Sequence, residues 1–212
     1  MVKPENKLKG SFENILTLPI SPTNVAVGNE WYIEANHVAT IVGGLAGYSG
    51  TRATSVGAGV VSALSPRREW DLNITQSLLL VTEGKKKHFQ VQHDKAIAIV
   101  SGTDPVEALG ENARKTQSFY QAILHPNNAW SMPVIDRHAV AVYMGRVVSD
   151  KELKWLDSPR VYSRIEKAYL KASKLSGINR HILQAMTWTQ WREDKGIISK
   201  PSRLNSRQLS TE

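Results

Sequence analysis

The sequence predicts an all-α fold of about nine or ten helices. Apolar residues recur three and four positions apart along almost the whole chain, as Trp70, Ile74 and Leu78 do. Clusters of Gly, Pro, Asn and Asp interrupt this spacing, as expected where helices end. Few segments show the alternating apolar pattern of strands. The chain has 212 residues, of which 41% are hydrophobic, and can therefore bury a sizeable core.

The predicted helices follow one another with short breaks between them. They cover residues 11–18, 30–45, 51–64, 67–81, 94–100, a short helix opened by Asp104-Pro105, 111–124, 136–146, 160–176 and 180–195. Proline suits the first helical position because its missing N–H would have no partner there. The run Gly84-Lys85-Lys86-Lys87-His88 is expected to be a solvated loop. We expect residues 1–197 to form one domain and residues 198–212 a flexible basic tail.

Composition restricts the possible functions. Lys and Arg outnumber Asp and Glu by 27 to 19, giving a net charge of +8, which favours a polyanionic partner such as nucleic acid. The absence of cysteine excludes disulfides, thiolate zinc sites and iron–sulfur clusters. The six histidines lack paired spacing with carboxylates, so we expect neither a metal nor another cofactor. The sequence shows no signal peptide and no membrane span, which predicts a cytoplasmic protein, and we favour a monomer.

Two short segments carry the candidate chemistry. Leu109-Gly-Glu-Asn-Ala-Arg-Lys115 is a tight turn that brings a lysine to the first turn of a helix. The unpaired N–H groups and the helix dipole there disfavour an ammonium ion and so favour the nucleophilic neutral amine. Met132-Pro-Val-Ile-Asp-Arg-His138 then brings Asp136 to an N-cap position. Taken singly, Lys115 could be a surface or phosphate-binding lysine, and Asp136 only a helix cap.

Together the two segments resemble the Lys/Asp active site of the helix-hairpin-helix DNA glycosylases, the superfamily of endonuclease III and the 8-oxoguanine glycosylases. The resemblance implies a glycosylase-like bundle that flips a nucleotide out of DNA. Lys115 would attack its anomeric carbon, and Asp136 would stabilise the positive charge at the sugar. The sequence is also similar to small proteins of phages and actinobacteria that share its Ala-Leu-Ser-Pro and Ile-Asp-Arg-His elements. This similarity implies a bacterial or phage-infected host cell.

The resemblance covers roughly residues 55–146. Residues 61–66, with Asn73 following, resemble the segment in which the family places a wedge residue that fills the gap left by the flipped base; Leu64 holds that position here. Residues 93–99 resemble the helix that leads into the hairpin. The residues expected to contact DNA are Leu64, Arg67, Arg68, Gly110, Asn112, Arg114 and Arg137.

The hairpin departs from the family pattern. The family generally has two glycines there, whose backbone N–H groups surround a DNA phosphate. Glu111 and Ala113 occupy these positions, and Gly110 lies one place earlier. A carboxylate beside a phosphate is unfavourable, so the departure puts phosphate binding by this hairpin in question.

Further residues are candidates for a base pocket. Trp70 and Trp188 could stack on an extruded base, as could Trp130 and Trp191, although tryptophans at helical spacing more often belong to a core. Gln184 could bind a base edge or an ordinary carbonyl group. His138 could act as an acid or base near neutral pH, although a packing role is the default.

The leading hypothesis is a DNA glycosylase, with or without lyase activity, that excises a modified or damaged base in DNA repair or modification. One alternative is a transferase of the same fold that remodels hypermodified bases in phage DNA. A second alternative is a non-catalytic DNA-binding module.

Overall fold

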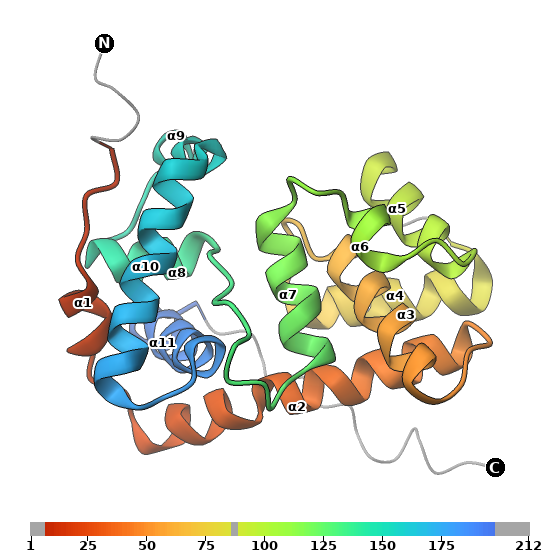
Figure 1. Cartoon of the computed structure of the whole chain (residues 1–212), viewed down its shortest axis with the longest axis horizontal. Helices are drawn as coiled ribbons and strands as arrows, with labels where there is room; N and C mark the ends of the chain where they lie inside the picture. Colours follow the sequence, from red (N-terminus) through yellow and green to blue (C-terminus); the bar gives the residue numbers. More distant parts are fainter. Residues whose placement is uncertain (1–6, 86–88, 198–212) are drawn as a thin grey trace.

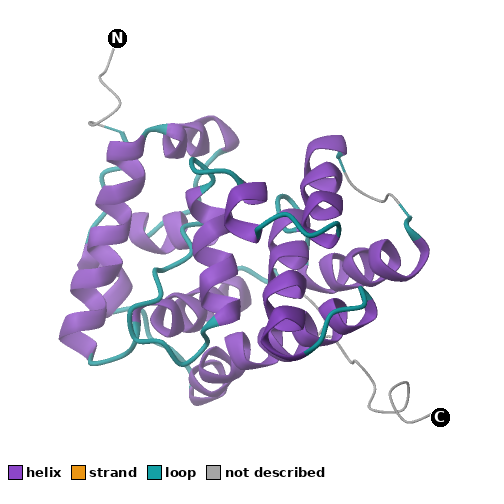
Figure 2. Cartoon of the chain, turned by 45° about the vertical axis from the view of Figure 1, so that its right-hand side comes forward, coloured by secondary structure: helices purple, strands orange, loops and turns teal. Residues whose placement is uncertain are grey.

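The computed structural model describes residues 7–85 and 89–197, and this part of the chain consists of helices and loops without strands (Figures 1 and 2). The all-α prediction is therefore confirmed. The helices are α1 (Phe12–Leu16), α2 (Pro22–Leu45), α3 (Gly50–Leu64), α4 (Trp70–Glu83), α5 (Gln90–Val100), α6 (Pro105–Leu109), α7 (Arg114–Leu124), α8 (Arg137–Met144), α9 (Asp150–Leu153), the 3₁₀ helix η2 (Lys154–Asp157), α10 (Pro159–Ser176) and α11 (Arg180–Asp194). Within these residues, no helix has the length and apolarity needed to cross a bilayer.

The largest difference from the predicted elements is at the start of α2. This helix begins at Pro22 and not at residue 30, because the Ser21 hydroxyl accepts a hydrogen bond from the N–H of Asn24 and Pro22 occupies the first turn. The gap predicted between residues 18 and 30 therefore contains the cap and the first turns of this helix. Helix α9, in which Ser149 and Glu152 form a reciprocal capping box, was not among the predicted helices. Lys86–His88 of the predicted loop, and the predicted tail, lie outside the described residues.

Two clusters of buried side chains form the core. The first is built mainly from α2 to α7 and includes Val42, Val60 and Ile123. The second joins α1, α8, α10 and α11, and includes Ile15, Ile165 and Tyr169. Helix α2 runs beneath both halves in Figure 1, packing against α3 at one end and against α11 at the other. One long helix therefore holds the two clusters together.

Small residues bring α2 and α3 very close to each other. A Cβ atom on Gly57 of α3 would lie 1.7 Å from the carbonyl oxygen of Ala39 in α2, a distance at which atoms overlap. Glycine is therefore required at this crossing, despite its low helix propensity. The close contact between α2 and α3 places the buried side chains of both helices in the first cluster.

Candidate active site

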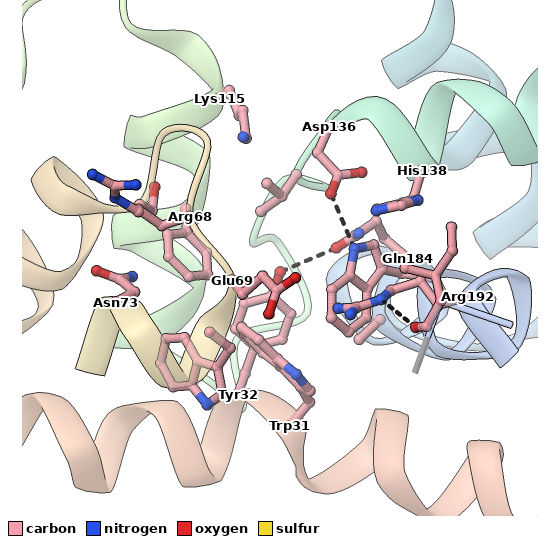
Figure 3. Close-up of a pocket in the computed structure, with 17 residues that line it drawn as sticks. Trp31, Tyr32, Arg68, Glu69, Asn73, Lys115, Asp136, His138, Gln184 and Arg192 are labelled. Atoms are coloured by element: carbon pink, nitrogen blue, oxygen red, sulfur yellow. Dashed lines mark hydrogen bonds between the residues drawn. The ribbon is translucent and has the colours of Figure 1, made fainter. Parts of the chain in front are cut away.

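A pocket of about 210 Å³ lies between the two core clusters (Figure 3). One wall comes from α2, α4, α7 and the turn between α3 and α4. The other comes from residues 134–138 and from α11. The pocket therefore depends on both halves of the molecule, and its lining residues come from parts of the chain that are far apart in sequence.

Most of the residues predicted for catalysis and base binding line this pocket. Those it brings together are Lys115, Asp136, Arg68, Trp70, His138, Gln184 and Trp188. They come from four separate stretches of the chain, which a common function would explain.

Asp136 is held by hydrogen bonds to both of its carboxylate oxygens. Its Oδ1 accepts from the N–H of Ala139 at 2.8 Å, which makes it the N-cap of α8 as predicted. Its Oδ2 accepts from the indole Nε1–H of Trp188 at 3.0 Å. The carboxylate is thus fixed in direction, and each oxygen keeps a further lone pair for another partner.

Lys115 lies opposite Asp136 across the mouth of the pocket, and its amine points into the space between them in Figure 3. The side chain is half-buried in the first turn of α7, a helix whose N-cap residue, Ala113, makes no side-chain hydrogen bond to it. Phe119, one turn further along α7, also lines the pocket. A lysine and a carboxylate therefore face a common space from two different helix N-termini.

Polar groups deeper in the pocket are positioned by their neighbours. The Oε1 atom of Gln184, in α11, accepts a hydrogen bond from the hydroxyl of Tyr32, in α2, at 3.1 Å. The His138 ring lies edge-on to Trp188, with ring centroids 6.1 Å apart. Burial lowers the pKa of His138, and the nearby Asp136 carboxylate opposes this shift. Lowering the pKa favours the neutral imidazole, which can both donate and accept a hydrogen bond.

Sequence reasoning missed Arg192, which lies 8% exposed in the pocket wall. Its guanidinium carbon lies 4.3 Å from the centroid of the Trp188 ring, and its Nε donates to the carbonyl of Ile197. Burial lowers the pKa of Arg192, while Glu69, Asp136 and Asp71 oppose the shift. The spacing of Trp188 and Arg192, one helical turn apart, was the available signal.

The pocket lining is rich in aromatic rings. Trp31 of α2, also not predicted as a site residue, lies with its ring centroid 5.0 Å from that of Trp70, 5.8 Å from that of Phe119 and 6.0 Å from that of Trp188. These rings offer flat faces and edges to a planar ligand. Asn73 adds a buried amide whose Oδ1 has no hydrogen-bond partner.

The wedge prediction for Leu64 is wrong. Its side chain is 2% exposed and packs in the first core cluster, because it occupies the inner face at the end of α3. It therefore cannot enter a DNA stack. Arg67, in the turn that follows, is exposed and has a φ of 59°, so this turn projects a cation.

The other predicted DNA contacts lie outside the pocket. Gly110 and Asn112 form the turn between α6 and α7, where Gly110 has a φ of 91°. Arg114 points to the opposite side of α7 and donates to the Ser163 hydroxyl at 2.9 Å. Arg137 is exposed and ion-paired with Asp150.

Two of the four candidate tryptophans also lie elsewhere. Trp191 packs in the second core cluster, so stacking of a base on it is excluded. Trp130 is 76% exposed on the loop after α7 and does not line the pocket.

The described residues contain no group of three or more His, Cys, Asp or Glu side chains arranged to bind a metal ion. Residues 14–195 match the model of a family of unknown function, DUF7178. The chain belongs to the DUF7178 family. No curated protein matches the chain, and neither does any solved structure. The DUF7178 match includes every residue that lines the pocket except Ile197.

Proposed function

We propose that this protein is a DNA glycosylase that removes a modified or damaged base through Lys115 and Asp136. One observation carries the proposal: these two side chains, expected to form a pair from the sequence, face each other across an aromatic pocket. The net charge of +8 agrees with a DNA substrate. A structural lysine and a structural N-cap would not need to share a pocket.

In the proposed reaction the neutral amine of Lys115 attacks the anomeric carbon of a flipped nucleotide. The bond between this carbon and the base nitrogen breaks, its electron pair leaves with the base, and the base takes up a proton. The amine then loses a proton to the ring oxygen as the bond between this oxygen and the anomeric carbon breaks, so that the ring opens and a protonated Schiff base joins Lys115 to the sugar. Water then releases the enzyme, or β-elimination first cleaves the strand.

The other pocket residues have roles that follow from their chemistry. The fixed carboxylate of Asp136 stabilises the positive charge that develops on the sugar as the base leaves. The aromatic rings of Trp31 and Trp70 provide apolar walls for the flipped base. Gln184 and neutral His138 can hydrogen-bond to its edge.

The test is covalent trapping with borohydride on duplexes that carry damaged, hypermodified or abasic nucleotides. We expect an adduct with wild-type protein, its loss in Lys115→Gln and a decrease of about 10²-fold or more in base release in Asp136→Asn. The matched controls are Lys151→Gln, an exposed lysine on α9, and Asp104→Asn, which alters the N-cap of α6 outside the pocket. Both controls should keep wild-type activity.

Other outcomes would contradict the proposal in different ways. An adduct retained in Lys115→Gln rules out this amine as the nucleophile. An altered base that stays in the strand, detected by mass analysis of nucleosides, indicates a transferase. Duplex binding without turnover, unchanged in both variants, indicates a non-catalytic DNA-binding module.

A further inference from the structure

A second hollow lies on the other side of α7 from the pocket and shares no residue with it. It measures about 430 Å³ and is bounded by α7, the loop after α7 and α10. Lys115 and Phe119 face the active-site pocket, whereas Arg114, Gln117 and Gln121 of the same helix line this hollow. We call it, with its extension along α10, the α7–α10 groove.

Trp130 is the most exposed of the large hydrophobic side chains in the described residues, at 76%. It is nevertheless held in place. The Asn128 side chain accepts a hydrogen bond from the Trp130 backbone N–H at 2.9 Å, and the Arg180 guanidinium carbon lies 5.2 Å from the ring centroid. An indole that is backed by a cation and open to solvent is a suitable platform for stacking an unpaired base.

Cations continue from this hollow along the first turns of α10. Ser163 lines both the hollow and a neighbouring one that also includes Arg160, Arg164 and Lys167. These three residues are four and three positions apart, which places them on one face of the helix. They span about 10 Å at the rise of an α-helix, a length that fits the phosphates of a short strand.

The charges of the groove are predominantly positive. Arg114 donates to the Ser163 hydroxyl and to the Pro159 carbonyl, which are uncharged acceptors. Of the described residues that line the two hollows, four are Lys or Arg, and Glu166 is the one carboxylic acid. Burial raises the pKa of Glu166, and the Arg114 charge opposes the shift. Glu166 can accept a hydrogen bond from the exocyclic amino group of a base.

Amide side chains complete the lining. Gln117, whose Nε2 donates to the Gly110 carbonyl at 2.6 Å, lies beside Gln121 and Asn128 in the same hollow. Amides offer both donors and acceptors, and can therefore bind the edges of different bases. This combination of an aromatic platform, amides and a row of cations is typical of single-strand binding surfaces.

We propose that the α7–α10 groove binds single-stranded DNA. A base stacks on Trp130 with its edge toward the amides, and the phosphates follow Arg114, Arg160 and Lys167. The strand must be unpaired, because a base within a duplex does not present its face to a side chain. The inference goes beyond the proposed glycosylase reaction, since it uses a different set of residues.

The test measures the binding of a fluorescently labelled oligo(dT) by anisotropy at several salt concentrations. Trp130→Ala should weaken binding about tenfold or more, and Trp130→Tyr should retain most of the affinity because a phenol ring still stacks. Arg160→Gln and Lys167→Gln should each lower the slope of log K against log salt by about 0.7. Lys174→Gln, near the far end of α10, is the matched control and should leave the slope unchanged.

Three outcomes would overturn the inference. One is unchanged affinity in Trp130→Ala. Another is an effect of Lys174→Gln equal to that of Lys167→Gln, which would indicate general charge attraction. The third is tighter binding of an acidic peptide than of oligo(dT), which would make the groove a protein-binding surface. Since borohydride trapping is measured separately on duplexes, the failure of either proposal can be told from the failure of the other.

Discussion

At the scale of single residues, Asp136 combines a structural role with a candidate chemical one. Its Oδ1 caps α8, and its Oδ2 accepts a hydrogen bond from Trp188. A carboxylate held by two donors needs little reorganisation when charge develops beside it, which is how preorganised groups stabilise a transition state. In the proposed reaction Trp188 would therefore position Asp136; Arg192 stacks on the Trp188 ring.

Replacing Trp188 by phenylalanine tests this role. Trp188→Phe keeps an aromatic ring against Arg192 but removes the Nε1–H donor to Asp136. We expect kcat/KM for base release to fall about tenfold to hundredfold, the range for one hydrogen bond to a charged group, with most of the loss in kcat. Single-turnover assays provide the measurement. Trp70→Phe, at a pocket residue with no hydrogen bond to Asp136, should change kcat far less; equal losses in both variants would rule out positioning.

The sequence indicated that Lys115 and Asp136 belong together, and both line one pocket, but it did not indicate the packing around them. Lys115 and Asp136 each stand in a recognisable local pattern, a turn before a helix and an apolar run before a helix. The donor to Asp136 lies 52 positions away in Trp188. Nothing in local spacing specifies such a pair, because it depends on how α8 and α11 pack. Leu64 shows the reverse error, since its place in a motif suggested exposure and the packing of α3 buries it.

At the scale of elements, apolar spacing predicted which segments are helical, and capping residues predicted where the helices begin and end. The ends were wrong where a cap was taken as a break, as at Ser21 and Pro22. A whole helix was missed where it is too short to show apolar periodicity, as in α9. The crossing of α2 and α3 was not predictable from the sequence. Glycine within a helical pattern indicates low helix propensity, and its role in close packing becomes visible only when the neighbouring helix is in place.

Two alanine substitutions distinguish a glycine needed for close helix packing from one that only lowers helix propensity. Gly57→Ala places a methyl group against the Ala39 carbonyl and should lower the free energy of unfolding by about 2–3 kcal/mol. Gly44→Ala, at an exposed position of α2 with nothing within 4 Å of the added methyl, should raise the free energy of unfolding by about 0.5–1 kcal/mol. Urea titrations measure both. Gly57→Ala as stable as wild type would contradict the close crossing of the two helices.

At the scale of the whole molecule, the two core clusters share α11, and α2 of the first cluster packs against this helix. Ala185 of α11 belongs to the first cluster, while Leu183 of the same helix belongs to the second. The hydrogen bond from Tyr32 to Gln184 also joins the two helices. Elements common to both clusters cannot unfold in one without exposing apolar surface in the other.

The molecule should therefore unfold in a single cooperative transition. Circular dichroism reports the helices, and tryptophan fluorescence reports rings in both clusters, such as Trp31 and Trp191. We expect the two thermal curves to coincide, because local melting of either half would break shared packing. Gly57→Ala, which acts in the first cluster, should move both curves together. Two separate midpoints would show that the clusters are independent.

The span of α2 has a consequence for how the pocket can vary. At its α11 end, a Cβ on Gly28 would lie 2.4 Å from the side chain of Met186, so α2 also packs closely there, as it does against Gly57 of α3. Helix α2 therefore sets the spacing between the wall that carries Lys115 and the wall that carries Asp136. Changes at either contact would alter the distance between amine and carboxylate without replacing either group, so residues that do not line the pocket help to set how far the lysine must reach.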